Sequence, residues 1–145
     1  MIEFHDVYST PGASQILWEL MLERAEEHGV NISFSLPTRE QHEVYVKHSP
    51  YALWYLANLD DDWLGYVYAS WDNEIGIWVF REHRGRGYGP KILKMFLDEN
   101  SPLPGVPGKR SSHFVANINP SNERSIHMFK SFGFRHIQAT YSYEP

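Results

Sequence analysis

Residues 79–89 read VFREHRGRGYG and form the most distinctive pattern in the chain. Glycine occupies every second position at the end of this stretch, at Gly85, Gly87 and Gly89. Because glycine has no Cβ atom, a ligand can approach such a segment closely. Arg84 and Arg86 add fixed positive charge and forked N–H donors, which suit phosphate oxygens. The stretch therefore predicts a phosphate-binding loop.

The flanking residues place this loop between a strand and a helix. Residues 74–80 (EIGIWVF) are rich in aromatic and β-branched residues, which favours a strand. Residues 90–99 carry an apolar stripe at helical spacing, and Pro90 is tolerated in a first helical turn. In this order, strand then turn then helix, free N–H groups gather at a helix N-terminus, where the helix dipole favours an anion.

The rest of the chain predicts a single domain over residues 1–145. Apolar spacing predicts further helices over residues 14–28, 38–48 and 122–132, with Gly29 ending the first of them. Alternating or aromatic stretches predict strands over residues 2–7, 51–59, 63–70, 113–118 and 134–143. Short polar breaks separate the strands between residues 51 and 80, which is typical of an antiparallel meander.

Composition excludes several classes of protein. With 145 residues, 42% hydrophobic and 21% charged, the chain has a globular balance, and without cysteine it has no disulfide or thiolate site. It shows no secretion signal and no apolar stretch that could span a bilayer, so a cytoplasmic protein without membrane contact is expected. The eight histidines show no metal-ligand spacing, and we expect no metal.

The charge is unevenly distributed. Residues 81–94 carry +4, which leaves −9 on the remainder of a chain whose net charge is −5. A nucleic-acid-binding protein would spread its basic residues over a wider surface. One basic island in an acidic chain instead favours a compact anionic ligand.

A dinucleotide-binding Rossmann unit is a poor match, because no third glycine and no acidic strand end follow at the required spacing. The stretch VFREHRGRGYG instead resembles the acetyl-CoA signature of the GNAT N-acetyltransferase superfamily, through Arg84, Gly87 and Gly89. Downstream, residues 122–134 (NERSIHMFKSFGF) resemble the second motif of that family. The predicted order of elements also matches, so the resemblance covers nearly the whole chain.

The resemblance implies an α/β protein of the α+β type. Its mixed, mostly antiparallel central sheet would be flanked by about four helices, and the sheet would splay beside its fourth strand. Acetyl-CoA is the implied cosubstrate. Its pantetheine arm would lie along Ile77, Trp78 and Val79, and its pyrophosphate would bind the segment Arg84, Gly85, Arg86, Gly87, Tyr88 and Gly89. Asn122 and Phe129 would lie beside the arm.

The pattern defines the catalytic residues only in part. The oxyanion donor that the resemblance implies is the backbone N–H of Val79. Many family members protonate the departing thiolate with a tyrosine, but the matching residue here is Phe129, which has no proton to donate. Ser125 is a candidate substitute, with a helix-capping role as the alternative. Glu74 is the candidate general base, with a solvated glutamate beside a turn as the alternative.

The predicted activity is transfer of acetyl from acetyl-CoA to a primary amine by direct attack. A small molecule such as an amino sugar, or a protein N-terminus, is the expected acceptor, and nucleic acid is not an expected partner. The absence of the tyrosine keeps a non-catalytic acyl-CoA-binding module open as an alternative. The oligomeric state is open as well, with a homodimer among the alternatives.

Overall fold

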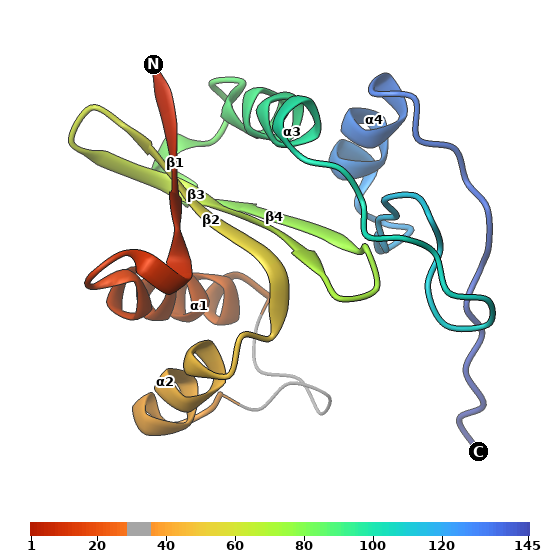
Figure 1. Ribbon diagram of the computed structural model, residues 1–145, viewed down its shortest axis with the longest axis horizontal. Helices are drawn as coiled ribbons and strands as arrows, with labels where there is room; N and C mark the ends of the chain where they lie inside the picture. The colour runs from red at the N-terminus through yellow and green to blue at the C-terminus, as the bar shows by residue number, and fades with distance from the viewer. Residues whose placement is uncertain (29–35) are drawn as a thin grey trace.

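A computed structural model describes residues 1–28 and 36–145, and Gly29, expected to end the first helix, lies outside them. One antiparallel sheet of four strands, in the order β1-β2-β3-β4, forms its centre (Figure 1). The strands are β1 (Ile2–Asp6), β2 (Tyr51–Leu59), β3 (Asp62–Ser70) and β4 (Ile75–Val79). The α-helices are α1 (Ala13–His28), α2 (Arg39–Lys47), α3 (Tyr88–Glu99) and α4 (Glu123–Ser131). The α/β class, the mainly antiparallel sheet and the four helices are confirmed.

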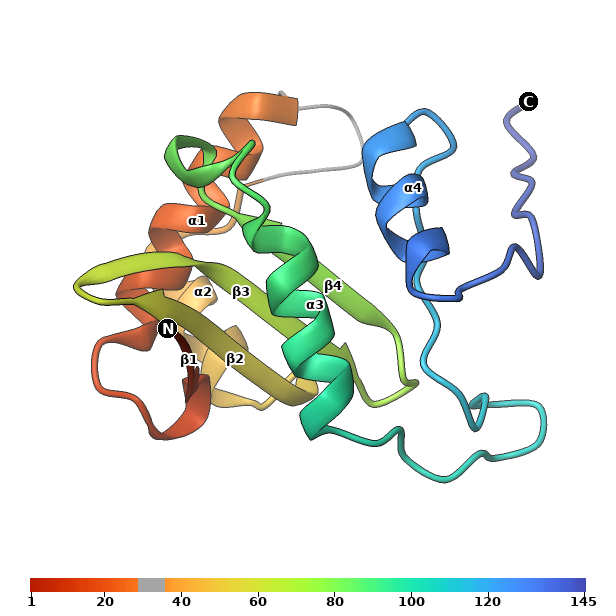
Figure 2. The same cartoon turned by 90° about the horizontal axis from the view of Figure 1, so that it is seen from above.

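The helices cover both faces of the sheet. Figures 1 and 2 show α1 and α2 on one face, and α3 on the other face with α4 beyond β4. The α3-side core joins sheet residues to α3 and α4, and includes Val67, Ile75, Ile92, Leu93, Phe96 and Phe129. The α1-side core includes Leu17, Leu20, Val46, Trp54 and Leu56, with Tyr51, Tyr66, Tyr68 and Trp78 packed against it.

Local signals fix the ends of two helices. Thr38 caps α2 by accepting a hydrogen bond from the Gln41 N–H at 3.1 Å, and the Gln41 side chain accepts from the Thr38 N–H at 2.9 Å. This reciprocal pair satisfies two N–H groups that a helix start leaves free. Gly87 stands before α3 with φ 79° and ψ 13°, a left-handed conformation that glycine adopts without steric cost.

The backbone of β4 has one edge that β3 does not use. Ser70 donates to the Glu74 carbonyl and Phe80 donates to the Leu64 carbonyl, both at 2.8 Å, so even-numbered residues of this segment bond to β3. Because bonding alternates along an antiparallel pair, the N–H groups of Ile75, Ile77 and Val79 point to the other edge. β4 is therefore an edge strand whose outer edge carries the N–H groups of these three residues.

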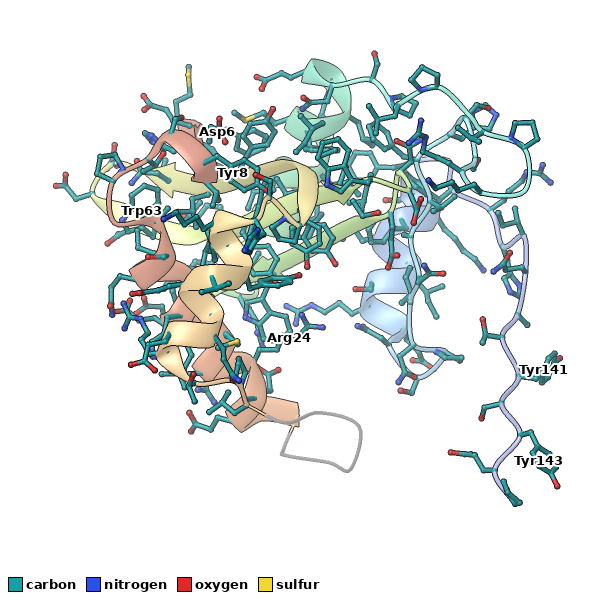
Figure 3. All side chains as sticks on the ribbon, turned by 60° about the horizontal axis from the view of Figure 1, so that its bottom comes forward. Asp6, Tyr8, Arg24, Trp63, Tyr141 and Tyr143 are labelled. Atoms are coloured by element: carbon teal, nitrogen blue, oxygen red, sulfur yellow. The ribbon has the colours of Figure 1, made fainter. Side chains whose placement is uncertain are left out.

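The predicted strands at residues 113–118 and 134–143 do not form. Only Val115 pairs with the free edge, through one parallel bridge to Glu74, in which the Ile75 N–H donates to the Val115 carbonyl at 2.8 Å. Residues 135–145 are exposed and extended, with Tyr141 and Tyr143 standing away from the sheet (Figure 3). A strand needs a paired neighbour, and pattern alone could not show that none lies beside these segments.

Asn73 holds the loop after α3 against the β3–β4 hairpin. Its side chain is 1% exposed and donates to the carbonyls of Leu103 at 2.9 Å and Ser111 at 2.8 Å. The Leu103 N–H donates back to its Oδ1 at 2.8 Å. Its backbone has φ 65°, which asparagine tolerates better than most residues. This one side chain therefore ties the 101–115 segment, and with it Val115, to the start of β4.

Candidate active site

The loop before α3 presents a row of free backbone donors. Within the described residues, the N–H groups of residues 85 to 89 donate no hydrogen bond. Gly85 and Gly87 have φ of 78° and 79°, and no atom lies within 4 Å of the place where a Cβ would stand on either residue. The space over these glycines is open, so a ligand could contact the donors directly. The geometry fits a bound pyrophosphate, whose oxygens accept several N–H bonds at a helix N-terminus.

Arg84 is turned away from this row of donors. Its Nε donates to the Val79 carbonyl at 3.0 Å, and its Nη1 lies 2.6 Å from both carboxylate oxygens of Glu27 on α1. Its guanidinium also stands over the Trp78 ring, 4.5 Å from the ring centre. A side chain with three such partners fixes the loop in place, so Arg84 fits a positioning role better than direct contact with phosphate.

Arg86 is the arginine that remains available. It is exposed and forms no ion pair or hydrogen bond with residues 1–28 or 36–145. Lys91, on the first turn of α3, is also exposed and its Nζ lies 5.9 Å from the centre of the Tyr88 ring. The charge that could complement a bound phosphate therefore comes from Arg86 and Lys91.

The strand edge predicted for the pantetheine arm is present, but only two of its three residues direct their N–H groups towards it. Ile77 and Val79 turn their N–H groups to the free edge, whereas the Trp78 backbone bonds to Tyr66 of β3. The Trp78 side chain lies on the α1 face, and its Nε1 donates to Glu23 Oε2 at 3.3 Å. Contact of Ile77, Trp78 and Val79 with a cofactor arm stays a prediction, and the edge favours Ile77 and Val79.

On α4 the second motif forms a capped helix next to the start of α3. Asn122 Oδ1 accepts from the Ser125 N–H at 3.1 Å, which caps the helix. The Ser125 hydroxyl is half-buried and forms no hydrogen bond with the described residues. Phe129 is 6% exposed and packs edge-on against Phe134, with ring centres 5.1 Å apart. Phe129 thus serves the α3-side core, and its predicted contact with the cofactor arm remains untested.

Glu74 stands just before β4, beside a group of tyrosines. Its N–H bonds to Ser70 Oγ at 3.1 Å. Burial raises the pKa of Tyr68, and the negative charge of Glu74 raises it further. Glu74 and the Tyr68 phenol are therefore close enough to interact. The role of Glu74 as a base stays a prediction.

Two features beside the candidate site were not predicted from the sequence. One is a row of carboxylates on α1: Glu23 accepts from the Arg81 N–H at 3.1 Å, Glu26 lies 3.5 Å from Arg81, and Glu27 pairs with Arg84. Their spacing opposite a basic island was a usable signal. The other is a tyrosine group from α2, β2 and β3 that shows no common local pattern; its members are Tyr45, Tyr51, Tyr66 and Tyr68.

Two surface cavities lie apart from the glycine loop. One of about 270 Å³ is lined by Leu53, Asn73, Asn100 and Phe114 among others. The other, of about 490 Å³, lies where Tyr8, Ser14 and Lys47 meet. No three metal-binding side chains gather in the described part of the chain, and none of its helices is long and apolar enough to cross a membrane.

Comparisons with known proteins support one family. The family model described as "Acetyltransferase (GNAT) domain" matches residues 17–135. A comparison with curated protein sequences gives no match.

Solved structures share the fold. An acetyltransferase from Thermus thermophilus is 21% identical with a TM-score of 0.67, over 95% of this chain and 89% of that one. A ribosomal-protein-alanine N-acetyltransferase from Brucella melitensis biovar Abortus 2308 is 14% identical with a TM-score of 0.65, over 99% and 97%. AAC(6')-Iy, solved with the bisubstrate analogue CoA-S-monomethyl-acetylneamine, is 14% identical with a TM-score of 0.65, over 100% and 98%. On the family match across most of its length, this chain belongs to the GNAT acetyltransferases and is an acyltransferase.

Proposed function

We propose that the protein transfers an acetyl group from acetyl-CoA to a primary amine. The observation that carries the proposal is the row of five unbonded N–H groups over residues 85–89, next to a strand edge with outward donors at Ile77 and Val79. The space over Gly85 and Gly87 is open, and together the two features match a pyrophosphate joined to an extended arm. Acetyl-CoA has this form, and the family uses it.

The chain's own groups suit the chemistry. The loop amides would bind the pyrophosphate, with Arg86 and Lys91 complementing its charge. An outward N–H group of β4, from Ile77 or Val79, would stabilise the oxyanion that forms when the amine attacks the thioester. Glu74 would accept the amine proton, directly or through water, because a free amine with a pKa near ~10 is mostly protonated at neutral pH. Ser125, whose hydroxyl has no partner among the described residues, is a candidate acid.

For the acceptor, a small amine such as an amino sugar and a protein N-terminus are the two candidates. Structures of similar fold carry titles of both kinds, namely the ribosomal-protein-alanine N-acetyltransferase and the acetylneamine complex. The acidic charge outside residues 81–94 favours a cationic acceptor of either kind. The oligomeric state is open, and light scattering would distinguish a homodimer from a monomer.

The test is thiol release from acetyl-CoA with a panel of amines, comprising aminoglycosides, amino sugars and peptides with free N-termini. We expect stoichiometric release of CoA and acetyl transfer with at least one class of acceptor. Tight binding of acetyl-CoA without turnover on any amine would instead support the acyl-CoA-binding module. Failure to bind acetyl-CoA would contradict both.

A further inference from the structure

Tyr68 lies across β4 because Gly76 leaves room for it. The two residues are paired between β3 and β4. A Cβ built on Gly76 would stand 2.2 Å from two ring carbons of Tyr68 and 2.4 Å from its hydroxyl oxygen. Any larger residue at position 76 would therefore displace the ring. The glycine seats the phenol directly over β4, one residue from Ile77, whose N–H points to the free edge.

Tyr68 also belongs to a chain of three contacting tyrosines. The Tyr68 ring stacks on Tyr51 with ring centres 3.8 Å apart. The Tyr45 hydroxyl donates to the Tyr51 hydroxyl at 3.0 Å. Tyr45 is 48% exposed, so its end of the chain reaches water. Burial raises the pKa of Tyr51 and of Tyr68, which keeps both phenols protonated at neutral pH.

We infer that Tyr68 is the proton donor to the departing thiolate, and that Tyr51 and Tyr45 resupply its proton from water. The inference rests on the proposed function. A cofactor arm that starts at residues 85–89 and follows β4 runs from Val79 towards Ile75, which brings its thioester end beside Gly76. The phenol over Gly76 then occupies the role that Phe129 cannot fill, because Phe129 has no acidic proton and is buried in the α3-side core.

Atoms and electrons balance in this step. The amine nitrogen forms a bond to the acetyl carbon, the carbon–sulfur bond breaks, and its electron pair leaves on sulfur. Sulfur takes the proton of Tyr68, the Tyr68 oxygen takes that of Tyr51, the Tyr51 oxygen takes that of Tyr45, and the Tyr45 oxygen takes a proton from solvent. The proton lost by the amine leaves separately, through Glu74 or water. The products are an N-acetylated amine and CoA with its thiol protonated.

A direct test uses CoA itself and needs no acceptor. The thiol of CoA bound to the protein is titrated by the ultraviolet absorbance of its thiolate, in wild type and in Tyr68→Phe, which keeps the ring. A hydrogen bond from Tyr68 stabilises the thiolate, so its loss should raise the thiol pKa by about one to two units. Gly76→Ala, which displaces the ring, should give the same shift, and the double variant should add nothing.

The control is Tyr55→Phe, which removes a β2 hydroxyl that bonds to Asn100 on the α3 side of the sheet. It should titrate like wild type. Once an acceptor is known, Tyr68→Phe should lower kcat about 10²-fold, the lower end of general-acid effects, while leaving the KM for acetyl-CoA unchanged.

The outcomes separate the two proposals. If wild type does not bind CoA, the proposed function fails and this inference falls with it. If wild type and Tyr68→Phe both bind CoA and their thiols titrate alike, the proposed function stands and the assignment of Tyr68 is wrong. A thiol shift that appears in Ser125→Ala instead of Tyr68→Phe would transfer the role to Ser125.

Discussion

Replacing Gly87 with valine tests the binding loop most directly. Gly87 has φ 79°, and nothing in the described protein lies within 4 Å of the position of its missing Cβ. A valine side chain would therefore enter the space over the loop without striking the protein. It would stand where a pyrophosphate must lie to reach the N–H groups of residues 85–89.

The structure allows both effects of this change to be estimated. The left-handed backbone conformation costs a valine about 1–2 kcal/mol, which lowers the free energy of unfolding by that amount. Blocking two of the five N–H contacts removes charge-assisted hydrogen bonds worth about 1.5–3 kcal/mol each. The loss of about 3–6 kcal/mol in binding corresponds to roughly 10²–10⁴-fold weaker affinity, at about 1.4 kcal/mol for each factor of ten.

The measurement is calorimetric titration with acetyl-CoA, after circular dichroism has shown that the variant is folded. Gly108→Val is the matched control: Gly108 has φ 73° and equally open surroundings, but it lies in the turn between Val106 and Arg110. It should lose similar stability and keep its affinity. If folded Gly87→Val binds acetyl-CoA as tightly as Gly108→Val, the loop does not hold the pyrophosphate.

Three further predictions concern the stability of the fold and the proposed catalytic base. Asn73→Ala removes three hydrogen bonds to the backbone of Leu103 and Ser111. At about 0.5–1.5 kcal/mol for each bond, the free energy of unfolding should fall by about 1.5–4.5 kcal/mol in urea denaturation. A loss below about 1 kcal/mol would show that Asn73 does not hold the loop after α3. Burial lowers the pKa of His42, so the unfolded chain binds more protons than the folded protein as the pH falls through the usual histidine pKa of about 6.5, and the free energy of unfolding falls with the pH. His42→Gln should flatten this part of the plot of the free energy of unfolding against pH, by at most about 1.4 kcal/mol per pH unit. An unchanged slope would show that other groups cause it. Glu74→Gln should lower kcat without changing the KM for acetyl-CoA, and wild-type rates across pH would leave Glu74 as a surface residue.

The sequence predicted what depends on local pattern. The three middle strands and the helices follow from alternation, apolar spacing and turn residues, and their bounds agree with the structure to within two residues. The order strand, glycine turn, helix also located the free N–H groups, because the left-handed conformations at Gly85 and Gly87 are a local property of the chain.

Features that depend on distant partners could not be predicted in this way. Residues 113–118 have the composition of a strand, but only Val115 reaches β4, because a strand also requires a paired neighbour over its length. Tyr68 resembled any aromatic residue of a sheet. Its position became meaningful only when Gly76, eight residues further along, was seen beneath its ring.

The motif located Arg84 in the chain but did not predict which residues its side chain contacts. The pattern placed it at the phosphate loop, but its guanidinium binds Glu27, which lies 57 residues earlier in the sequence. Glu23 holds the neighbouring Arg81 N–H and the Trp78 indole in the same way. Since these carboxylates share one face of α1, the helix that covers the tyrosine side of the sheet also fixes the start of the glycine loop at residues 84–89. Movement of α1 on binding an acceptor would therefore act on the loop that is proposed to hold CoA.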